Sequence, residues 1–131
     1  MRFRRALTML ITSAAVVFSI LISTTPASAT EKNGVVELGE FGLYLNTGST
    51  GTVLDLYFAD TDFSNDNFPN TSIPADNNTE SYRNRDTYWW HVFTGASYTG
   101  SHGCVQSGYV GDATPTYQDT ISSAYFSSSS C

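Results

Sequence analysis

The chain has 131 residues and a formal net charge of −6, with 40% hydrophobic and 14% charged residues. A chain of this length supports one domain with one modest core. An acidic surface repels phosphate backbones, so we expect no nucleic-acid partner. The same charge suits solubility, cation binding or a basic protein partner.

The N-terminal segment, 1–29, has the layout of a secretory signal peptide. Three arginines precede an apolar stretch from about residue 6 to 22, and the small-residue site Ala27-Ser28-Ala29 follows. This layout predicts cleavage after Ala29 and a secreted, extracellular protein. The alternative is a membrane anchor, although the stretch contains four hydroxyl residues and is barely long enough to span a bilayer.

Cleavage would leave residues 30–131 as a single-domain mature chain that no longer contains a membrane-spanning run. This mature chain has 102 residues, three of them basic and twelve acidic, for a net charge of −9. Its two cysteines, Cys104 and Cys131, predict one disulfide, because an exported protein with an even cysteine count favours pairing. In the chain-entropy model, closing the loop between them stabilises the fold by about 3–4 kcal/mol.

Short strand-like runs and turn residues fill the mature chain, and no helix signal is present. The runs are FGLYLN (41–46), TVLDLYF (52–58), YWWHVF (88–93), GCVQS (103–107) and SSAYF (122–126). Many short strands separated by turns predict an all-β sandwich or a small barrel.

Two phrases in the chain occur twice. YLNTGSTG and FTGASYTG each place a glycine seven positions after an aromatic, Tyr44 or Phe93, where it lets a hairpin fold back over the ring. The polar phrases NNTESY and QDTISS align Ser81 with Ser122 at an offset of 41. A serine before the last strand of a unit can bond its own backbone and hold an arch.

The doubled phrases divide the mature chain into two units, about residues 35–86 and 88–126. An aromatic, six residues and glycine, followed by Asx-Asx, two spacers and two hydroxyl residues, resembles the βγ-crystallin Greek-key motif. SYRNRDTYWWHVF (81–93) is more particularly similar to the bacterial metalloprotease-inhibitor family with that fold, peptidase inhibitor family thirty-six. The resemblance implies an all-β fold in which two Greek-key motifs pack as one β-sandwich. It also implies a monomeric inhibitor of extracellular proteases, in particular metalloproteases.

The resemblance further implies a pair of calcium sites where the two polar phrases meet, with oxygen ligands of the kind that calcium prefers. Carried over, the hydroxyl ligands are Ser81 and Ser122, and the backbone-carbonyl ligands are Thr79, Thr120, Leu45 and Thr94. The alternative is that the serines only hold the arches.

The first unit is longer than the second by about eight residues, which most simply fall in the polar stretch 60–76. A loop this long in a compact domain is usually functional or disordered. Phe63 and Phe68 are apolar residues in its acidic surround, so we interpret them as anchors of an inhibitory loop. The alternative is that both phenylalanines fold back onto the sandwich.

Nothing in the sequence carries a local catalytic signature, so we expect a non-enzymatic protein. Two other functions remain open. One is a calcium-binding or structural module without inhibitory activity. The other is a killer-toxin-like or glycan-binding protein, for which aromatic residues on the solvent face would form a stacking platform.

Overall fold

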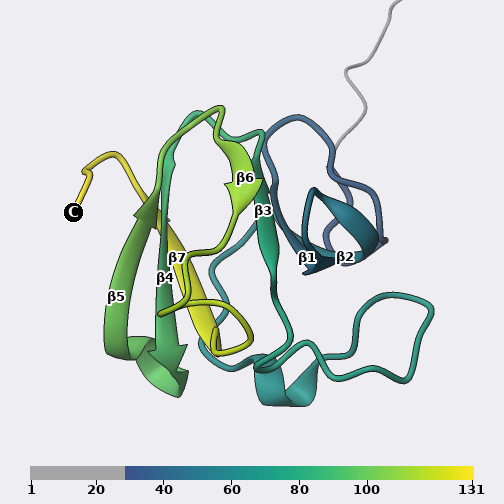
Figure 1. Ribbon diagram of the computed structural model, residues 1–131. Helices are drawn as coiled ribbons and strands as arrows, with labels where there is room; N and C mark the ends of the chain where they lie inside the picture. Colours follow the sequence, from purple (N-terminus) through teal and green to yellow (C-terminus); the bar gives the residue numbers. More distant parts are fainter. Residues whose placement is uncertain (1–28) are drawn as a thin grey trace, which may run out of the picture.

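A computed structural model describes residues 29–131 (Figure 1), so the predicted signal peptide, apart from Ala29, lies outside the described residues. The strands are β1 (Phe41–Asn46), β2 (Thr50–Leu56), β3 (Ser81–Asn84), β4 (Trp89–Gly95), β5 (Thr99–Val105), β6 (Val110–Asp112) and β7 (Ser123–Ser127), and the 3₁₀ turns are η1 (Phe63–Asn65) and η2 (Ala96–Tyr98). Within this part of the chain, neither turn is long or apolar enough to cross a membrane.

The strands form two antiparallel sheets that pack as a sandwich (Figure 1), which confirms the predicted all-β fold. One sheet has the order β2-β1-β3-β6 and the other β5-β4-β7. Each sheet also pairs with a segment from the other unit. β6 pairs with β3, and the main chain at Asp60 bridges to Ala124 in β7. These exchanges interlock the two units into one body.

The two aromatic-glycine phrases form equivalent hairpins, β1–β2 and β4–β5. The pairing register shifts after Tyr44 in the first hairpin and after Phe93 in the second. Gly51 and Gly100 then adopt φ angles of 76° and 82°. These angles lie in the left-handed region that favours glycine. The sequence repeat is therefore also a structural repeat.

Ser81 is the residue that fixes the first hairpin. It is fully buried, its Oγ donates to the Asn46 carbonyl over 2.6 Å, and the Ser49 amide donates to the same Oγ over 2.9 Å. The hydroxyl is therefore engaged as both donor and acceptor. We call this arrangement a serine clamp.

The second serine clamp uses Ser123, not Ser122. Ser123 Oγ donates to the Gly95 carbonyl over 2.7 Å and accepts from the Tyr98 amide over 3.0 Å. The predicted equivalence of Ser81 and Ser122 is therefore wrong by one residue. Each clamp must begin the strand that pairs with the folded hairpin, and the strand that follows the second polar phrase begins at Ser123.

The polar phrases form two arches, residues 76–80 and 118–122, that pair with each other. The Asn77 amide donates to the Ile121 carbonyl over 3.0 Å, and the Asp119 amide donates to the Thr79 carbonyl over 2.9 Å. Asn77 and Asp119 also share a left-handed φ, 59° and 55°. These two residues therefore occupy equivalent positions, and the same alignment makes Glu80 the counterpart of Ser122.

A single hydrophobic core fills the space between the sheets. At its centre, the Phe41 ring stacks on Trp90 and Tyr82 with centroid distances of 5.0 and 5.8 Å. Trp90 is fully buried, and its indole Nε1 donates to the Asp86 carboxylate over 3.0 Å. Burial of each large apolar side chain contributes about 1.5–3 kcal/mol, and this core supplies the rigid base for the surface segments.

Candidate functional site

The first part of the inserted stretch 60–76 is folded onto the sandwich, because Asp60 and Phe63 pair with residues of the second unit, and the rest of the stretch is anchored by a buried side chain. Phe63 and Phe68 are both fully buried and belong to the core cluster. The prediction that they are exposed anchors for a partner is therefore wrong. The Phe63 amide donates to the Ser122 carbonyl over 2.9 Å, which turns the segment inward and places the ring over the core.

Residues 66–75 form a small projecting hairpin, which we call the rim hairpin. Asn67 and Pro74 form a bridge, and the Phe68 amide donates to the Ile73 carbonyl over 2.9 Å. At its base, the Ala75 amide donates to the Asp66 carbonyl over 3.0 Å. In Figure 1 the rim hairpin is the loop that extends from the body of the sandwich between η1 and β3.

The tip of the rim hairpin is held by its own hydrogen bonds. The Thr71 amide and hydroxyl donate to the Phe68 carbonyl over 3.1 and 2.8 Å. The Ile73 amide donates to Thr71 Oγ1 over 3.1 Å. Ile73 is an apolar side chain at this tip and is 38% exposed. The buried Phe68 therefore supports an ordered tip that presents a different apolar residue.

An ion triad ties the inserted stretch to the segment that precedes β1. Lys32 Nζ lies 2.8 Å from an Asp60 carboxylate oxygen and 2.9 Å from one of Asp66. Partial burial opposes the charge of Lys32, but the hydrogen bonds to both carboxylates outweigh it and raise the pKa of the ammonium group. Because Asp60 and Asp66 flank η1, the triad holds η1 and the base of the rim hairpin in place.

The residues predicted to bind calcium lie at or beside the paired arches, but one of them has another role. The hydroxyl of Ser81 belongs to the first serine clamp, so it is not the counterpart of the Ser122 hydroxyl. Ser122 Oγ donates to the Asn77 side-chain oxygen over 3.2 Å, and Thr120 Oγ1 donates to the Thr116 carbonyl over 2.9 Å.

The remaining predicted carbonyl ligands are Leu45, Thr94 and Thr79. Leu45 and Thr94 follow the hairpin aromatics and are half-buried, whereas Thr79 is buried. One signal was missed: the triplet Asp76-Asn77-Asn78 allows two alignments of the first polar phrase, and the structure selects the one that puts Glu80 opposite Ser122.

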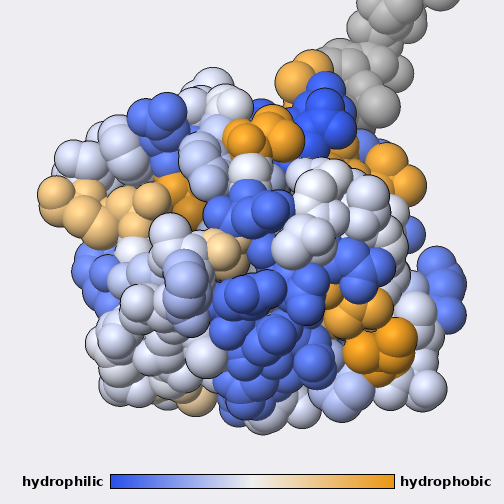
Figure 2. Space-filling view, in the orientation of Figure 1, coloured by the Kyte–Doolittle hydropathy of each residue, from blue (hydrophilic) through white to orange (hydrophobic). Residues whose placement is uncertain are grey.

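The structure also contains an exposed aromatic groove that the sequence did not predict. Tyr57, Phe58, Tyr88 and Phe126 line an exposed groove beside Gly39. On the face shown in Figure 2, hydrophilic residues occupy the centre, and hydrophobic residues form small separate groups toward the left, the top and the right. This face therefore presents no broad apolar interface.

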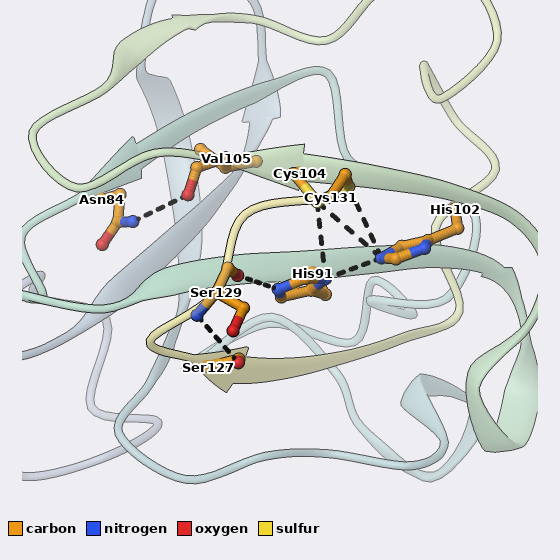
Figure 3. Close-up of a disulfide and its surroundings, with 8 residues drawn as sticks. All are labelled: Asn84, His91, His102, Cys104, Val105, Ser127, Ser129 and Cys131. Carbon is orange, nitrogen blue, oxygen red and sulfur yellow. Dashed lines mark hydrogen bonds between the residues drawn. A yellow bond between two sulfur atoms is a disulfide. The ribbon is translucent and has the colours of Figure 1, made fainter.

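Cys104 and Cys131 form the predicted disulfide (Figure 3), which ties β5 to the segment beyond β7. The linked Cα atoms are 5.8 Å apart. His91 and His102 lie beside the two sulfur atoms, an arrangement that spacing in the sequence did not indicate.

Comparison with known proteins adds a family and a fold. The family model described as "Peptidase inhibitor family I36" matches residues 35–105. A structure described as "Evolution of the eye lens beta-gamma-crystallin domain fold" aligns with a TM-score of 0.60 at 20% identity, over 72% of this chain and 93% of that chain. A βγ-crystallin from Ciona intestinalis aligns with a TM-score of 0.56 at 16% identity, over 68% of this chain and 100% of that chain.

A βγ-crystallin domain from Clostridium beijerinckii aligns with a TM-score of 0.55 at 18% identity, over 69% of this chain and 99% of that chain. A search of curated proteins found no similar sequence. The family is one of inhibitors and not of enzymes, in agreement with the expectation of a non-enzymatic protein. The family match spans more than half of the chain, and the chain therefore belongs to peptidase inhibitor family I36 and has the fold of a βγ-crystallin domain.

Proposed function

We propose that the chain is a secreted inhibitor of extracellular metalloproteases that binds its target through the rim hairpin. The observation that carries this proposal is an exposed Ile73 at the tip of a hairpin whose other large apolar side chain, Phe68, is buried in the core. A loop already held in its bound shape loses little conformational entropy on binding, so more of the contact energy appears as affinity.

The rim hairpin has the properties of a poorly cleavable substrate. An exposed aliphatic side chain suits a hydrophobic specificity pocket of a peptidase. The hydrogen bond between Ala75 and Asp66 closes the base of the hairpin, and the bond between Phe68 and Ile73 closes its tip. A cut within the tip would leave both ends attached to the sandwich, so the cleaved segment would stay in place and favour resealing or slow release.

Inhibition assays with Ile73→Ser test the role of the tip. Full burial of an isoleucine is worth about 1.5–3 kcal/mol, and Ile73 is 38% exposed, so a target can gain about 1 kcal/mol from it and the variant should inhibit about three- to sevenfold more weakly. The matched control is Val110→Ser, which removes another exposed aliphatic side chain, 62% exposed, from β6. The panel should include metallo-, serine and cysteine endopeptidases.

Three results distinguish the parts of this proposal. Inhibition of metalloproteases that is weakened only in Ile73→Ser supports it. Equal inhibition by both variants would mean that the binding surface lies outside the rim hairpin. Inhibition of another peptidase class alone would overturn the metalloprotease assignment and leave the hairpin role intact.

A calcium site at the paired arches is the second function that we propose. It is supported by the symmetric arches and by Asp76, whose Oδ1 is buried without a hydrogen-bond partner. Glu80 and Ser122 occupy equivalent positions, so each would supply a side-chain oxygen from its own arch, and carboxylate and hydroxyl oxygens suit this hard cation. Millimolar calcium should then raise the melting temperature, because a ligand bound only by the folded state stabilises it.

A further inference from the structure

All histidines and cysteines of the chain meet at one corner of the molecule. The chain contains two histidines and two cysteines. His91 Nδ1, His102 Nε2 and the sulfur atoms of Cys104 and Cys131 all lie within 4.8 Å of one another (Figure 3). The histidines come from β4 and β5, Cys104 from β5 and Cys131 from the segment beyond β7. We call this group the His–Cys corner.

The distances between the nitrogen and sulfur atoms are close to those between ligands of one ion. In a tetrahedral zinc site, bond lengths of about 2.0 Å to nitrogen and about 2.3 Å to sulfur place nitrogen and sulfur about 3.5 Å apart. Cys104 Sγ lies 3.4 Å from His91 Nδ1 and 3.8 Å from His102 Nε2, and Cys131 Sγ lies 3.7 Å from His102 Nε2. The two imidazole nitrogens are 2.7 Å apart. To bind one ion together, they would have to separate by roughly half an ångström.

The protein orients both imidazoles before any ligand arrives. His91 Nε2 donates to the Ser129 carbonyl over 2.8 Å. In the neutral ring, Nδ1 therefore carries the lone pair, faces the corner and accepts from His102 Nε2, so His102 must transfer this proton to its own Nδ1 before its Nε2 can bind a cation. The His91 ring stacks on Tyr125 with a 6° interplanar angle, and the His102 ring stacks on Phe93 with a 7° angle. Hydrogen bonding to the distal nitrogen and fixed ring planes are the usual supports of metal-binding histidines.

The His–Cys corner is also accessible. His91 is buried, but Cys104 is half-buried, and His102 and Cys131 are exposed. In the disulfide form, the sulfur atoms are not thiolates, and only the two imidazoles remain as ligands. Reduction would supply the two missing anionic ligands, and the two sulfur atoms would have to move apart to about 3.8 Å to bind one ion.

We propose that the reduced chain binds one zinc-class divalent cation through His91, His102, Cys104 and Cys131. The reductant is a thiol: two thiol molecules are oxidised to their disulfide while the Cys104–Cys131 bond takes up two electrons and two protons. The cation then binds the two cysteine sulfurs as thiolates and releases those two protons to solvent. The segment after β7 thus stays attached to β5 in either redox state, by a covalent bond or by a metal.

Cobalt(II) titration tests this site, because thiolate-bound cobalt gives an intense charge-transfer absorption that disulfide sulfur does not. The reduced chain should bind one equivalent of cobalt with this band, and zinc should displace it. The untreated disulfide form should show no such band. His102→Ala, which removes one ligand from an exposed position, should weaken cobalt binding in the reduced chain by at least about tenfold. Ser101→Ala, an exposed neighbour in β5, is the matched control.

Two measurements make the outcome decisive even if reduction loosens the fold. Circular dichroism of the reduced chain should show native strand content with zinc, whether or not it does so without zinc. Cobalt binding by the urea-unfolded reduced chain gives the affinity of two unorganised cysteines. The proposal is overturned if the folded chain binds no tighter than the unfolded one, if His102→Ala binds as tightly as the native chain, or if no thiolate band develops.

Discussion

At the scale of single residues, the serine clamps predict that neighbouring serines contribute unequally to the free energy of unfolding. Ser81→Ala and Ser123→Ala each remove a buried hydroxyl that both donates and accepts. Each should therefore lower the free energy of unfolding by about 1–3 kcal/mol. Ser122 Oγ makes a single hydrogen bond, over 3.2 Å, to a side chain. Ser122→Ala should cost less than about 1 kcal/mol. Urea unfolding of the three variants checks this order, and a larger loss in Ser122→Ala than in Ser123→Ala would contradict it.

Glu40 gives the fold a pH dependence. Its side chain is fully buried, Oε2 accepts from the Glu37 amide over 2.7 Å, and Oε1 has no hydrogen-bond partner. Desolvation, assisted by nearby acidic charges, raises the pKa of Glu40 from 4.5 to about 7. A folded-state pKa above the unfolded value means that the protonated form stabilises the fold. This stabilisation is complete below about pH 4.5 and is lost as the pH rises through about 7.

Glu40→Gln should therefore flatten the pH dependence of stability. Between about pH 5 and 8 the native chain should lose up to about 1.4 kcal/mol per pH unit, and the variant should lose less. Glu80→Gln, measured without calcium, is the control for the removal of a carboxylate elsewhere. Melting curves at pH 5 and pH 8 give the comparison, and identical slopes for Glu40→Gln and the native chain would exclude the assignment.

At the scale of elements, substitutions in and beside the paired arches distinguish a calcium-binding role of this region from a structural one. If calcium binds between the arches, Glu80→Gln and Ser122→Ala should each reduce the rise in melting temperature that calcium produces. Ser81→Ala should lower the melting temperature without calcium and keep the calcium-dependent rise, because its hydroxyl belongs to a clamp. Differential scanning calorimetry with and without calcium measures the melting temperature and its calcium-dependent rise. If this rise is the same in Glu80→Gln, in Ser122→Ala and in the native chain, calcium does not bind at the arches.

Much of the element pattern could be predicted from the sequence, because turn residues and aromatic spacing act locally. The run FGLYLN coincides with β1, and the doubled aromatic-glycine phrase forms two equivalent hairpins. The rim hairpin could not be predicted in the same way. Phe63 and Phe68 lie in a polar stretch of the sequence, and their side chains enter the core where residue 63 pairs with residue 122 across the fold and residue 68 pairs with residue 73.

At the scale of the whole molecule, the repeat predicted the sandwich but not the contacts between its units. The triplet Asp76-Asn77-Asn78 allows two alignments of the first polar phrase, and the alignment chosen from the sequence paired Ser81 with Ser122 instead of Ser123. The His–Cys corner joins residues from two strands and the C-terminal segment that are far apart in sequence, so no local spacing indicates it. Long-range packing, rather than local propensity, decides both features.

The most direct test of the account is to locate the surface of the chain that a bound peptidase covers. Hydrogen exchange should be measured on the free chain and on its complex with a metalloprotease that it inhibits. We predict that protection is concentrated in the rim hairpin, residues 66–75, with little change in the exposed groove lined by Tyr57, Phe58, Tyr88 and Phe126. Protection of that groove with an unchanged rim hairpin, or no complex with any metalloprotease, would contradict the account.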